Sequence, residues 1–339
     1  MNENHLNDEF VCLMVRRDDA GNVAAATEKI SIADLPPGDV LIEVAYSSLN
    51  YKDALACQAH PGVVRQLPHV PGIDAAGRVV ESDSVDFQPG DEVLVTGYDL
   101  GTTHWGGYAE YVRVPATWVV AMPPGMTPQE AMSYGTAGFT AAQCVAAIRH
   151  HGVKPGTGEV VVTGASGGVG SLSVAILAKL GYQVTAITGK PEQAGMLQQL
   201  GASQILAREE VHDTSEKPLL RSRWAAAVDT VGGRALATLL RSTHHRGCVA
   251  ACGLAAGHDL PMTVYPFILR GVTLAGIDSA QCPRDSRLQI WQRLATDWRI
   301  DGLEEIVRKI SLAKLPAAAA NMLAGKTFGR TLVEPQATR

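Results

Sequence analysis

The chain has 339 residues, 46% of them hydrophobic, and a formal net charge of −5 at pH 7. This length is sufficient for two domains with sizeable cores. The weak negative charge argues against nucleic acid or an anionic membrane as partner, and the sequence contains neither a nucleic-acid-binding motif nor an apolar run of membrane-spanning length.

The N-terminal stretch and the cysteines predict a cytoplasmic protein. Met1 to Glu9 is polar and acidic, without the apolar core of a signal peptide. The six cysteines are scattered and form no Cys-x-x-Cys pair, which favours reduced thiols. We interpret Cys248 and Cys252 as small core residues at a buried strand.

The segment from residue 10 to about 114 is β-rich and interrupted by Gly and Pro. Strands are predicted at 40–46, 77–81, 93–95 and 107–114. This irregular, turn-rich pattern favours a small barrel. Pro123-Pro124-Gly125 then marks a linker, and Thr127 with Glu130 predicts a capped helix start.

From residue 136 to about 276, helix and strand patterns alternate. Helices are predicted at 140–148, 172–180, 192–200 and 235–240. Strands are predicted at 160–163, 184–187, 204–206, 225–229, 247–252 and 272–277. The alternation predicts a doubly wound parallel sheet in an α/β fold. A polar helix at 286–297 and a final strand at 331–334 follow, and we expect that strand to return to the N-terminal domain.

A glycine-rich turn lies at the centre of this alternation. The strand ending at Thr163 leads into Gly164-Ala165-Ser166-Gly167-Gly168-Val169-Gly170 and then into a helix that closes at Gly181. Such a turn lets the backbone approach a pyrophosphate at the helix N-terminus. The spacing departs from G-x-G-x-x-G, so a tight turn without a ligand is the alternative.

The following strand bears on the choice of cofactor. It ends at Thr188-Gly189-Lys190, and no acidic residue occurs before Glu192. An NAD site usually carries Asp or Glu here for the ribose hydroxyls. A hydroxyl and a cation suit a 2′-phosphate, which favours NADPH over NADH. A solvated loop lysine is the alternative for Lys190.

Further motifs occur in a fixed order from about residue 11 to 334. They are Ser48-Leu49-Asn50-Tyr51-Lys52-Asp53-Ala54-Leu55, Pro71-Gly72-Ile73-Asp74, His104-Trp105-Gly106-Gly107, Gly135 to Ala141, Asp229-Thr230-Val231-Gly232, Cys248 to Leu254, Pro266 to Arg270, and Gly329 to Val333. Together with the glycine turn, they resemble the acrylyl-CoA reductases of the AcuI/YhdH type. That group is part of the zinc-free quinone-oxidoreductase branch of the medium-chain dehydrogenase/reductase superfamily.

The resemblance implies two domains and a dimer. A GroES-like catalytic domain would comprise residues 1–130 with 300–339, and a Rossmann NADPH-binding domain residues 131–299. The apolar strand at 272–277 should end the sheet, and an exposed edge of this kind needs a partner. Relatives join two such edges across a two-fold axis, so we expect a homodimer.

Zinc is not expected. Zinc-dependent relatives carry a ligand Cys near Asn50, a Gly-His-Glu where this chain has Gly72-Ile73-Asp74, and four close Cys near 95–115. This chain lacks all of them, and the neighbours of His60, His69 and His104 supply no ligand set. A short-chain dehydrogenase is set aside because Tyr182 and Tyr265 both fail its Tyr-x-x-x-Lys spacing.

The implied reaction is NADPH-dependent reduction of the C=C bond of acrylyl-CoA, a small acyl-CoA substrate. The resemblance implies catalytic roles for Asn50, Tyr51, Asp53, Asp74 and Arg330. Structural turns are the alternative for the two Asp residues, a structural ion pair is the alternative for Arg330, and solvent can replace Tyr51 as proton donor. A quinone or enone reductase and an NADPH-binding protein without turnover are the alternative functions.

The resemblance also implies a set of cofactor contacts. Ser166, Gly167, Gly168 and Val169 would line the pyrophosphate, and Thr188, Gly189 and Lys190 would hold the 2′-phosphate. Contacts to the nicotinamide and its ribose are expected from Tyr51, Leu254, Asp278 and Ser279. After Leu55 this chain has Cys57 to Gly62 where the family has a Gly/Lys-containing loop, which leaves the acyl-CoA preference open.

Overall fold

The computed structural model describes residues 9–336. The polar stretch in which no signal peptide was predicted lies outside these residues, apart from Glu9. The described residues form two compact units: the first unit comprises residues 9–136 and 303–336, and the second unit comprises residues 137–302. Within the described residues, no helix has both the length and the apolar character required of a membrane span.

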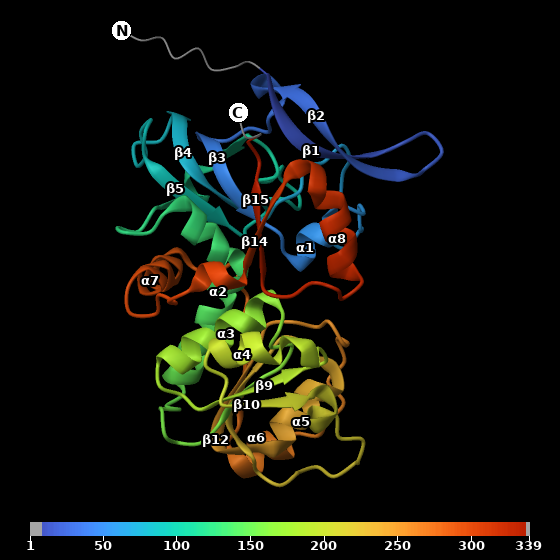
Figure 1. Ribbon diagram of the computed structural model, residues 1–339, viewed down its shortest axis with the longest axis vertical. Coiled ribbons are helices and arrows are strands. Elements are labelled where there is room, and N and C mark those ends of the chain that lie inside the picture. Colours follow the sequence, from blue (N-terminus) through green and yellow to red (C-terminus); the bar gives the residue numbers. More distant parts are fainter. Residues whose placement is uncertain (1–8, 337–339) are drawn as a thin grey trace. The chain divides into compact units, whose positions relative to one another are not determined.

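The first unit contains a two-stranded hairpin and a seven-stranded sheet (Figure 1). The hairpin pairs β1 (Glu9–Arg17) with β2 (Val23–Ser31). The sheet has the order β14 (Val307–Ser311), β15 (Arg330–Glu334), β3 (Val40–Ser48), β4 (Asp74–Ser82), β5 (Glu92–Thr96) and β7 (Val120–Ala121), with β6 (Tyr111–Val114) also paired to β3.

Strand β3 organises this sheet. It pairs with β4 along one side, and along the other side with β6 over its first half and with β15 at its end. Its residues Val40, Leu41, Ile42 and Val44 are fully buried, as expected for a central strand. The final strand therefore returns to the N-terminal part of the chain, as predicted, and brings Arg330 beside the end of β3.

Two short helices of the first unit lie side by side: α1 (Tyr51–Ala56) and α8 (Leu315–Leu323) (Figure 1). They share a core that includes Ala54 and Leu315. Helix α1 was not predicted, because six residues are too few for a helical period. The strand predicted at 107–114 begins only at Tyr111, because residues 108–110 bond to β1 instead: the Leu13 N–H donates to the Tyr108 carbonyl (2.8 Å), and the Glu110 N–H donates to the Val11 carbonyl (3.0 Å).

The second unit is a six-stranded parallel sheet, which confirms the predicted doubly wound arrangement. Its order is β10 (Gln204–Ala207), β9 (Val184–Thr188), β8 (Val160–Val162), β11 (Trp224–Asp229), β12 (Thr243–Ala251) and β13 (Thr273–Gly276). The chain reverses its direction of travel at β8, and at such a point the carboxyl ends of the strands leave a crevice for ligands.

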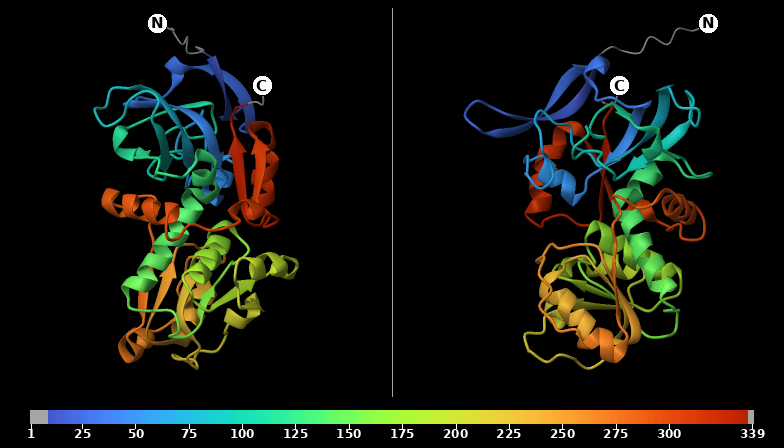
Figure 2. Two further views of the ribbon diagram at one scale, coloured as in Figure 1. Left: turned by 60° about the vertical axis from the view of Figure 1, so that its left-hand side comes forward. Right: turned by 180° about the vertical axis from the view of Figure 1, so that it is seen from behind.

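The connecting helices cover both faces of this sheet (Figure 2). Helices α3 (Gly168–Lys179) and α4 (Ala194–Gln199) join β8 to β10, while α5 (Gly233–Ser242) and α6 (Tyr265–Arg270) join β11 to β13. Because such crossovers are right-handed and the two pairs run in opposite directions along the sheet, they lie on opposite faces. Helix α7 (Arg284–Ala295) follows β13.

Helix α2 (Pro128–His150) begins at the predicted cap, where Thr127 Oγ1 accepts from the Glu130 N–H (3.2 Å), and it joins this helical segment to the one predicted at 140–148. The break lies at Gly135, whose φ of 50° and ψ of −157° are not helical. Residues on both sides of the break are mostly small or apolar and are largely buried.

Candidate active site

A buried polar network surrounds Asp74, the first residue of β4. The Asp74 carboxylate accepts hydrogen bonds from Ser48 Oγ (2.5 Å), Asn50 Nδ2 (2.7 Å), Thr136 N (2.9 Å) and Thr136 Oγ1 (2.6 Å). Its side chain has no solvent exposure. Four donors on one buried carboxylate offset the loss of its hydration.

Asp74 reaches Thr136 because helix α2 is interrupted at Gly135. A Cβ at this position would lie 2.5 Å from Asp74 Oδ2 and from Ser48 Oγ, and 2.8 Å from Arg330 Nη2. The second helical segment therefore starts with the Thr136 N–H directed at the carboxylate. A helix N-terminus favours negative charge at this position.

Arg330 supplies the positive charge of the network. It is 3% exposed, and it donates from Nη2 to Ser48 Oγ (2.8 Å), from Nη1 to Asn50 Oδ1 (3.2 Å) and from Nε to the Ser133 carbonyl (3.0 Å). Burial lowers the pKa of Arg330, which Asp74 and Asp53 oppose, and a guanidinium stays charged in proteins. Arg330 thus compensates Asp74 through the Ser48 hydroxyl and the Asn50 amide.

Asp53 lies on α1 beneath the same residues. Its carboxylate accepts hydrogen bonds from the backbone N–H groups of Asn50 (2.8 Å) and Ile73 (2.8 Å). Burial, followed by the charge of Asp74, raises the pKa of Asp53 to about 7. Asp53 therefore fixes the start of α1 against the irregular segment that leads into β4.

Tyr51 differs from the other four residues with predicted catalytic roles. Its side chain is 52% exposed, whereas Asn50, Asp53, Asp74 and Arg330 are buried. Tyr51 is the first residue of α1 and follows Asn50 directly. The structure thus places one of the five side chains where a ligand can touch it, and it buries the other four in or beside the polar network around Asp74.

In the second unit, the glycine turn forms a bare backbone cradle between β8 and α3. Gly164 has a φ of 56°, and a Cβ there would lie 2.3 Å from Thr230 Oγ1. A Cβ at Gly170 would lie 2.2 Å from the Gly164 carbonyl oxygen. Gly167 precedes the first turn of α3, whose N–H groups lack intrahelical acceptors. These features fit a pyrophosphate at the helix N-terminus.

The residues predicted to hold a 2′-phosphate lie next to this cradle. Ser166 Oγ and Thr188 Oγ1 are 3.0 Å apart, and the Lys190 N–H donates to Thr188 Oγ1 (3.0 Å). Burial lowers the pKa of Lys190, and Glu192 opposes that shift. The short loop Thr188 to Lys190 is therefore tied to Ser166 through one hydroxyl.

Arg208 is a further cation at this position that the sequence analysis did not identify. A Cβ on Gly189 would lie 3.4 Å from its Cζ and Nε atoms. Arg208 directly follows β10, which pairs in parallel with β9. The carboxyl ends of neighbouring parallel strands meet at one edge of a sheet. The position of Arg208 shortly after the predicted strand 204–206 was therefore the sequence feature that could have placed it near Lys190.

The remaining predicted contacts follow β12 and β13 at the same edge. Leu254 is 65% exposed. Asp278 Oδ1 accepts from the N–H groups of Ala280 (3.0 Å) and Gln281 (3.2 Å) and so closes its own turn. The Ser279 carbonyl accepts from Arg287 Nη2 (3.2 Å). Since β13 is three strands from β8, these last two residues are roughly 14 Å away from the cradle.

The part of the chain that the structure describes contains no group of three or more His, Cys, Asp or Glu side chains able to hold a metal ion. The histidines considered above have local roles. His60 Nδ1 accepts from the Gly62 N–H (3.1 Å), and His104 Nε2 lies 2.7 Å from the Arg113 carbonyl. His69 is buried and pairs its backbone with Val15.

A β-rich unit completed by the C-terminal strand, together with a doubly wound unit carrying a glycine cradle, is the architecture of a medium-chain dehydrogenase. Residues 36–124 match the alcohol dehydrogenase GroES-like domain, and residues 168–296 match the zinc-binding dehydrogenase family. The acrylyl-CoA reductase AcuI of Ruegeria pomeroyi is 48% identical over 329 residues, which cover 97% of this chain and 100% of that protein. The chain belongs to the medium-chain dehydrogenase/reductase superfamily, in the group that includes AcuI and YhdH.

Two solved structures of similar proteins cover nearly the whole chain. YhdH of E. coli K-12 with bound NADPH is 47% identical, with a TM-score of 0.92 over 96% of this chain and 100% of that one. The Bacillus subtilis protein YhfP with NAD bound is 47% identical, with a TM-score of 0.93 over 96% of this chain and 99% of that one. The predicted fold and family are thus confirmed.

Proposed function

We propose that this protein is an NADPH-dependent, zinc-independent reductase of the acrylyl-CoA C=C bond, with propionyl-CoA as product. The observation that carries the proposal is the end-to-end similarity to a protein named acrylyl-CoA reductase. The glycine cradle and the adjoining cations Lys190 and Arg208 support a phosphorylated nicotinamide cofactor. A thioester activates its own alkene, so the reaction needs donors for a developing enolate rather than a metal.

In this proposal each unit has a separate task. NADPH supplies a hydride when bound. Ser166 and the first turn of α3 bind its pyrophosphate, while Thr188, Lys190 and Arg208 bind its 2′-phosphate. The buried network of Asn50, Asp53, Asp74 and Arg330 positions Tyr51, which contacts the cofactor and the substrate.

The substrate class is tested by steady-state kinetics with acrylyl-CoA and with 1,4-benzoquinone under the same conditions. We expect the higher kcat/KM for acrylyl-CoA. A higher value for the quinone would make the protein a quinone reductase of the same fold. Tight NADPH binding without oxidation by any thioester, enone or quinone would indicate a binding protein without turnover.

Replacing Lys190 by alanine should weaken NADPH selectively. A charge-assisted hydrogen bond is worth roughly 1.5–3 kcal/mol, so the KM for NADPH should rise about tenfold or more. The KM for NADH should barely move, because NADH has no 2′-phosphate. Arg208→Ala should have a smaller effect of the same kind, since that side chain is well exposed.

The control for this prediction is Lys154→Ala, which removes an exposed lysine of the second unit outside the cradle. It should leave the KM for both cofactors unchanged. If Lys190→Ala weakens NADPH and NADH equally, Lys190 does not recognise the 2′-phosphate.

Replacing Tyr51 by phenylalanine should reduce kcat for acrylyl-CoA by less than about tenfold, because solvent can protonate an exposed enolate. The measurement is kcat from pH 6 to 9. General acid catalysis is typically worth about 10²–10⁴-fold. A loss beyond a hundredfold, with loss of the pKa on the basic limb, would instead identify Tyr51 as the proton donor.

We also propose a homodimer formed through the edge of the second unit. Among the described strands, β13 ends the sheet, and the adjoining α6 region exposes Val264 (61%), Ile268 (72%) and Leu269 (58%). A second copy would cover this apolar surface and pair the strand edge.

Light scattering at micromolar protein should give about twice the mass of one chain. Ile268→Asp should shift the mass toward the monomer, because it buries a charge in the interface. Val85→Asp is the matched control, since Val85 is fully exposed in the first unit. A monomer mass for the unmodified protein would contradict the dimer.

The cysteines support our proposal of a reducing, cytoplasmic location. All six are free thiols. Burial raises the pKa of Cys12 and Cys57 to about 12 and that of Cys248 to about 11, which keeps these three as unreactive thiols.

A further inference from the structure

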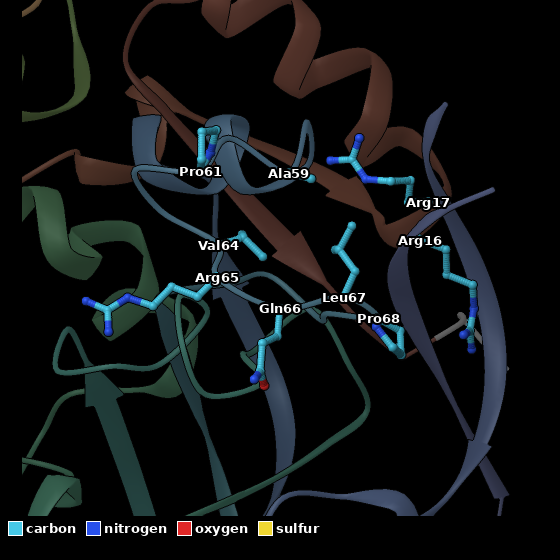
Figure 3. Close-up of a pocket in the computed structure, with 9 residues that line it drawn as sticks. All are labelled: Arg16, Arg17, Ala59, Pro61, Val64, Arg65, Gln66, Leu67 and Pro68. Carbon is cyan, nitrogen blue, oxygen red and sulfur yellow. The ribbon is translucent and has the colours of Figure 1, made fainter. Parts of the chain in front are cut away.

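A cavity of about 570 Å³ opens in the first unit between the end of β1 and the loop that follows α1 (Figure 3). It is lined by Arg16, Arg17, Ala59, Pro61, Val64, Arg65, Gln66, Leu67 and Pro68. Its lining contains three arginines and no acidic residue. Its volume lies within the range of sites that bind small molecules.

Backbone hydrogen bonds fix both walls of this arginine pocket. After α1, the His60 N–H donates to the Leu55 carbonyl (3.1 Å), and the Val64 N–H donates to the His60 carbonyl (2.9 Å). Val15 and His69 exchange two backbone hydrogen bonds of 2.8 and 3.0 Å. Because that bridge immediately precedes Arg16 and immediately follows Pro68, it holds the end of β1 against the loop.

The three arginines differ in how far their charge is compensated. Arg16 makes hydrogen bonds to both carboxylate oxygens of Glu28 (2.9 and 2.8 Å). Arg17 donates from Nη1 to the Gly21 carbonyl (3.1 Å) and forms no ion pair within residues 9–336. Arg65 has neither a hydrogen bond nor an ion pair to any residue that the structure describes. Two guanidinium groups thus retain donors for an anion.

The position of these two groups suits a ligand with two separate anionic parts. Figure 3 shows Arg17 extending toward Ala59, with Arg65 on the other side of Val64 and Leu67. The neighbouring Asp18 carboxylate is engaged by the backbone N–H (2.7 Å) and Nδ2 (2.9 Å) of Asn22. Apolar side chains between two guanidinium groups can contact the face of a nucleobase, on which arginine also stacks.

We propose that the arginine pocket binds the adenosine end of the acyl-CoA substrate, with Arg17 and Arg65 contacting its pyrophosphate and 3′-phosphate. This inference rests on the proposed function. The loop that lines the pocket begins where α1 ends, and Tyr51 is the first residue of α1. A six-residue helix is about 9 Å long, so the pantetheine arm can follow α1 from the pocket to Tyr51.

The first test compares acrylyl-CoA, acrylyl-dephospho-CoA and acrylyl-pantetheine as substrates of the unmodified protein, Arg17→Gln, Arg65→Gln and the double variant. Because Arg17 and Arg65 are exposed and solvent screens their contacts, each substitution should raise the KM for acrylyl-CoA only on the order of threefold to tenfold. The ratio of the KM for acrylyl-pantetheine to that for acrylyl-CoA should fall accordingly, because the former has no phosphoanhydride or 3′-phosphate. The variant that lacks the arginine contacting the 3′-phosphate should no longer distinguish acrylyl-CoA from acrylyl-dephospho-CoA.

The matched control is Arg78→Gln. Arg78 is an exposed arginine of the first unit that pairs with Glu92 and lies outside the pocket lining. It should leave all three KM values unchanged. The KM for acrylyl-CoA should also rise with ionic strength in the unmodified protein more steeply than in the double variant, since salt screens exposed charges.

A second test does not depend on turnover. Calorimetry with adenosine 3′,5′-bisphosphate is performed on protein saturated with NADP⁺, so that the cofactor cradle is occupied. Binding that the double variant weakens at least tenfold supports the proposal. Equal binding by both proteins contradicts it, and inorganic phosphate binding as tightly as the bisphosphate would reduce the pocket to a general anion site.

The two proposals fail in different ways. If none of the three thioesters is reduced, the proposed function is wrong, and the calorimetry alone decides whether the pocket binds a phosphorylated adenosine. If all three are reduced and the KM ratio is the same in the unmodified protein and the double variant, the function stands and the arginine pocket is not its CoA site.

Discussion

Replacing Gly135 by alanine should destabilise the protein by about 3 kcal/mol or more, since a strained backbone and an overpacked core each cost roughly 1–3 kcal/mol. The added Cβ would lie 2.5 Å from Asp74 Oδ2 and from Ser48 Oγ. The alternative, movement of Thr136 away from Asp74, would remove two hydrogen bonds from a buried carboxylate. Both the close contact of the added Cβ and the movement of Thr136 therefore reduce the stability of the folded protein.

The measurement is the unfolding free energy or Tm of Gly135→Ala beside Gly195→Ala. Gly195 lies in α4 without a positive φ, and a Cβ there would meet nothing within 4 Å. That control should gain up to about 1 kcal/mol, because alanine restricts the unfolded chain. If Gly135→Ala unfolds at the same temperature as the unmodified protein, the contact between Thr136 and Asp74 does not set the break in α2.

The second unit could be predicted from the sequence because its signals are local. Short apolar runs alternate with helical patterns, and glycines mark the turn between β8 and α3. Each prediction needed only a window of about a dozen residues. Arg208 was not identified from the sequence because no motif contains it. Its position beside Gly189 depends on the pairing of β10 with β9.

Most residues of the network in the first unit could be identified from sequence motifs, but the contacts between them could not be predicted from those motifs. Arg330 and Ser48 are 282 positions apart and meet only because β15 pairs with the end of β3. The break at Gly135 was equally hidden, since its neighbours suit a continuous helix. Local patterns do not report contacts of this kind, because their geometry is set by the pairing of distant strands.

The sequence motif gave Asn50, Tyr51 and Asp53 catalytic roles alike, but their burial in the structure distinguishes them. Asn50, Tyr51 and Asp53 lie within four positions, yet Tyr51 is half exposed while the other two are buried. Asp53 turns inward because its carboxylate satisfies the backbone N–H groups of Asn50 and Ile73. We therefore treat Asn50, Asp53, Asp74 and Arg330 as positioning residues and Tyr51 as the proposed contact to ligand.

The network depends on one cation, which makes Arg330 the second decisive position. Arg330→Met should cost about 3–5 kcal/mol near pH 7.5, because it leaves buried carboxylates without a compensating charge. It also removes the Arg330 donor from Asn50 Oδ1 and from the Ser133 carbonyl, and it leaves Ser48 Oγ with only the longer hydrogen bond from Asn50 Nδ2 (3.3 Å). Arg330→Lys keeps the charge, so its loss of stability should be smaller than that of Arg330→Met. Some loss should remain, because the ammonium cannot reach all three acceptors at once.

The pH dependence of this loss distinguishes charge compensation from simple packing. Burial and the charge of Asp74 already hold the folded-state pKa of Asp53 at about 7, above its unfolded value. Removing the cation raises the pKa of Asp53 in the folded state further. A raised carboxyl pKa costs stability as the pH rises above the pKa of that group in the unfolded chain.

The stability deficit of Arg330→Met relative to the unmodified protein should therefore shrink from pH 8 to pH 5, and it should shrink further when Asp74→Asn is added. A deficit below about 1 kcal/mol, or one that does not change with pH, would show that Arg330 does not compensate this pair.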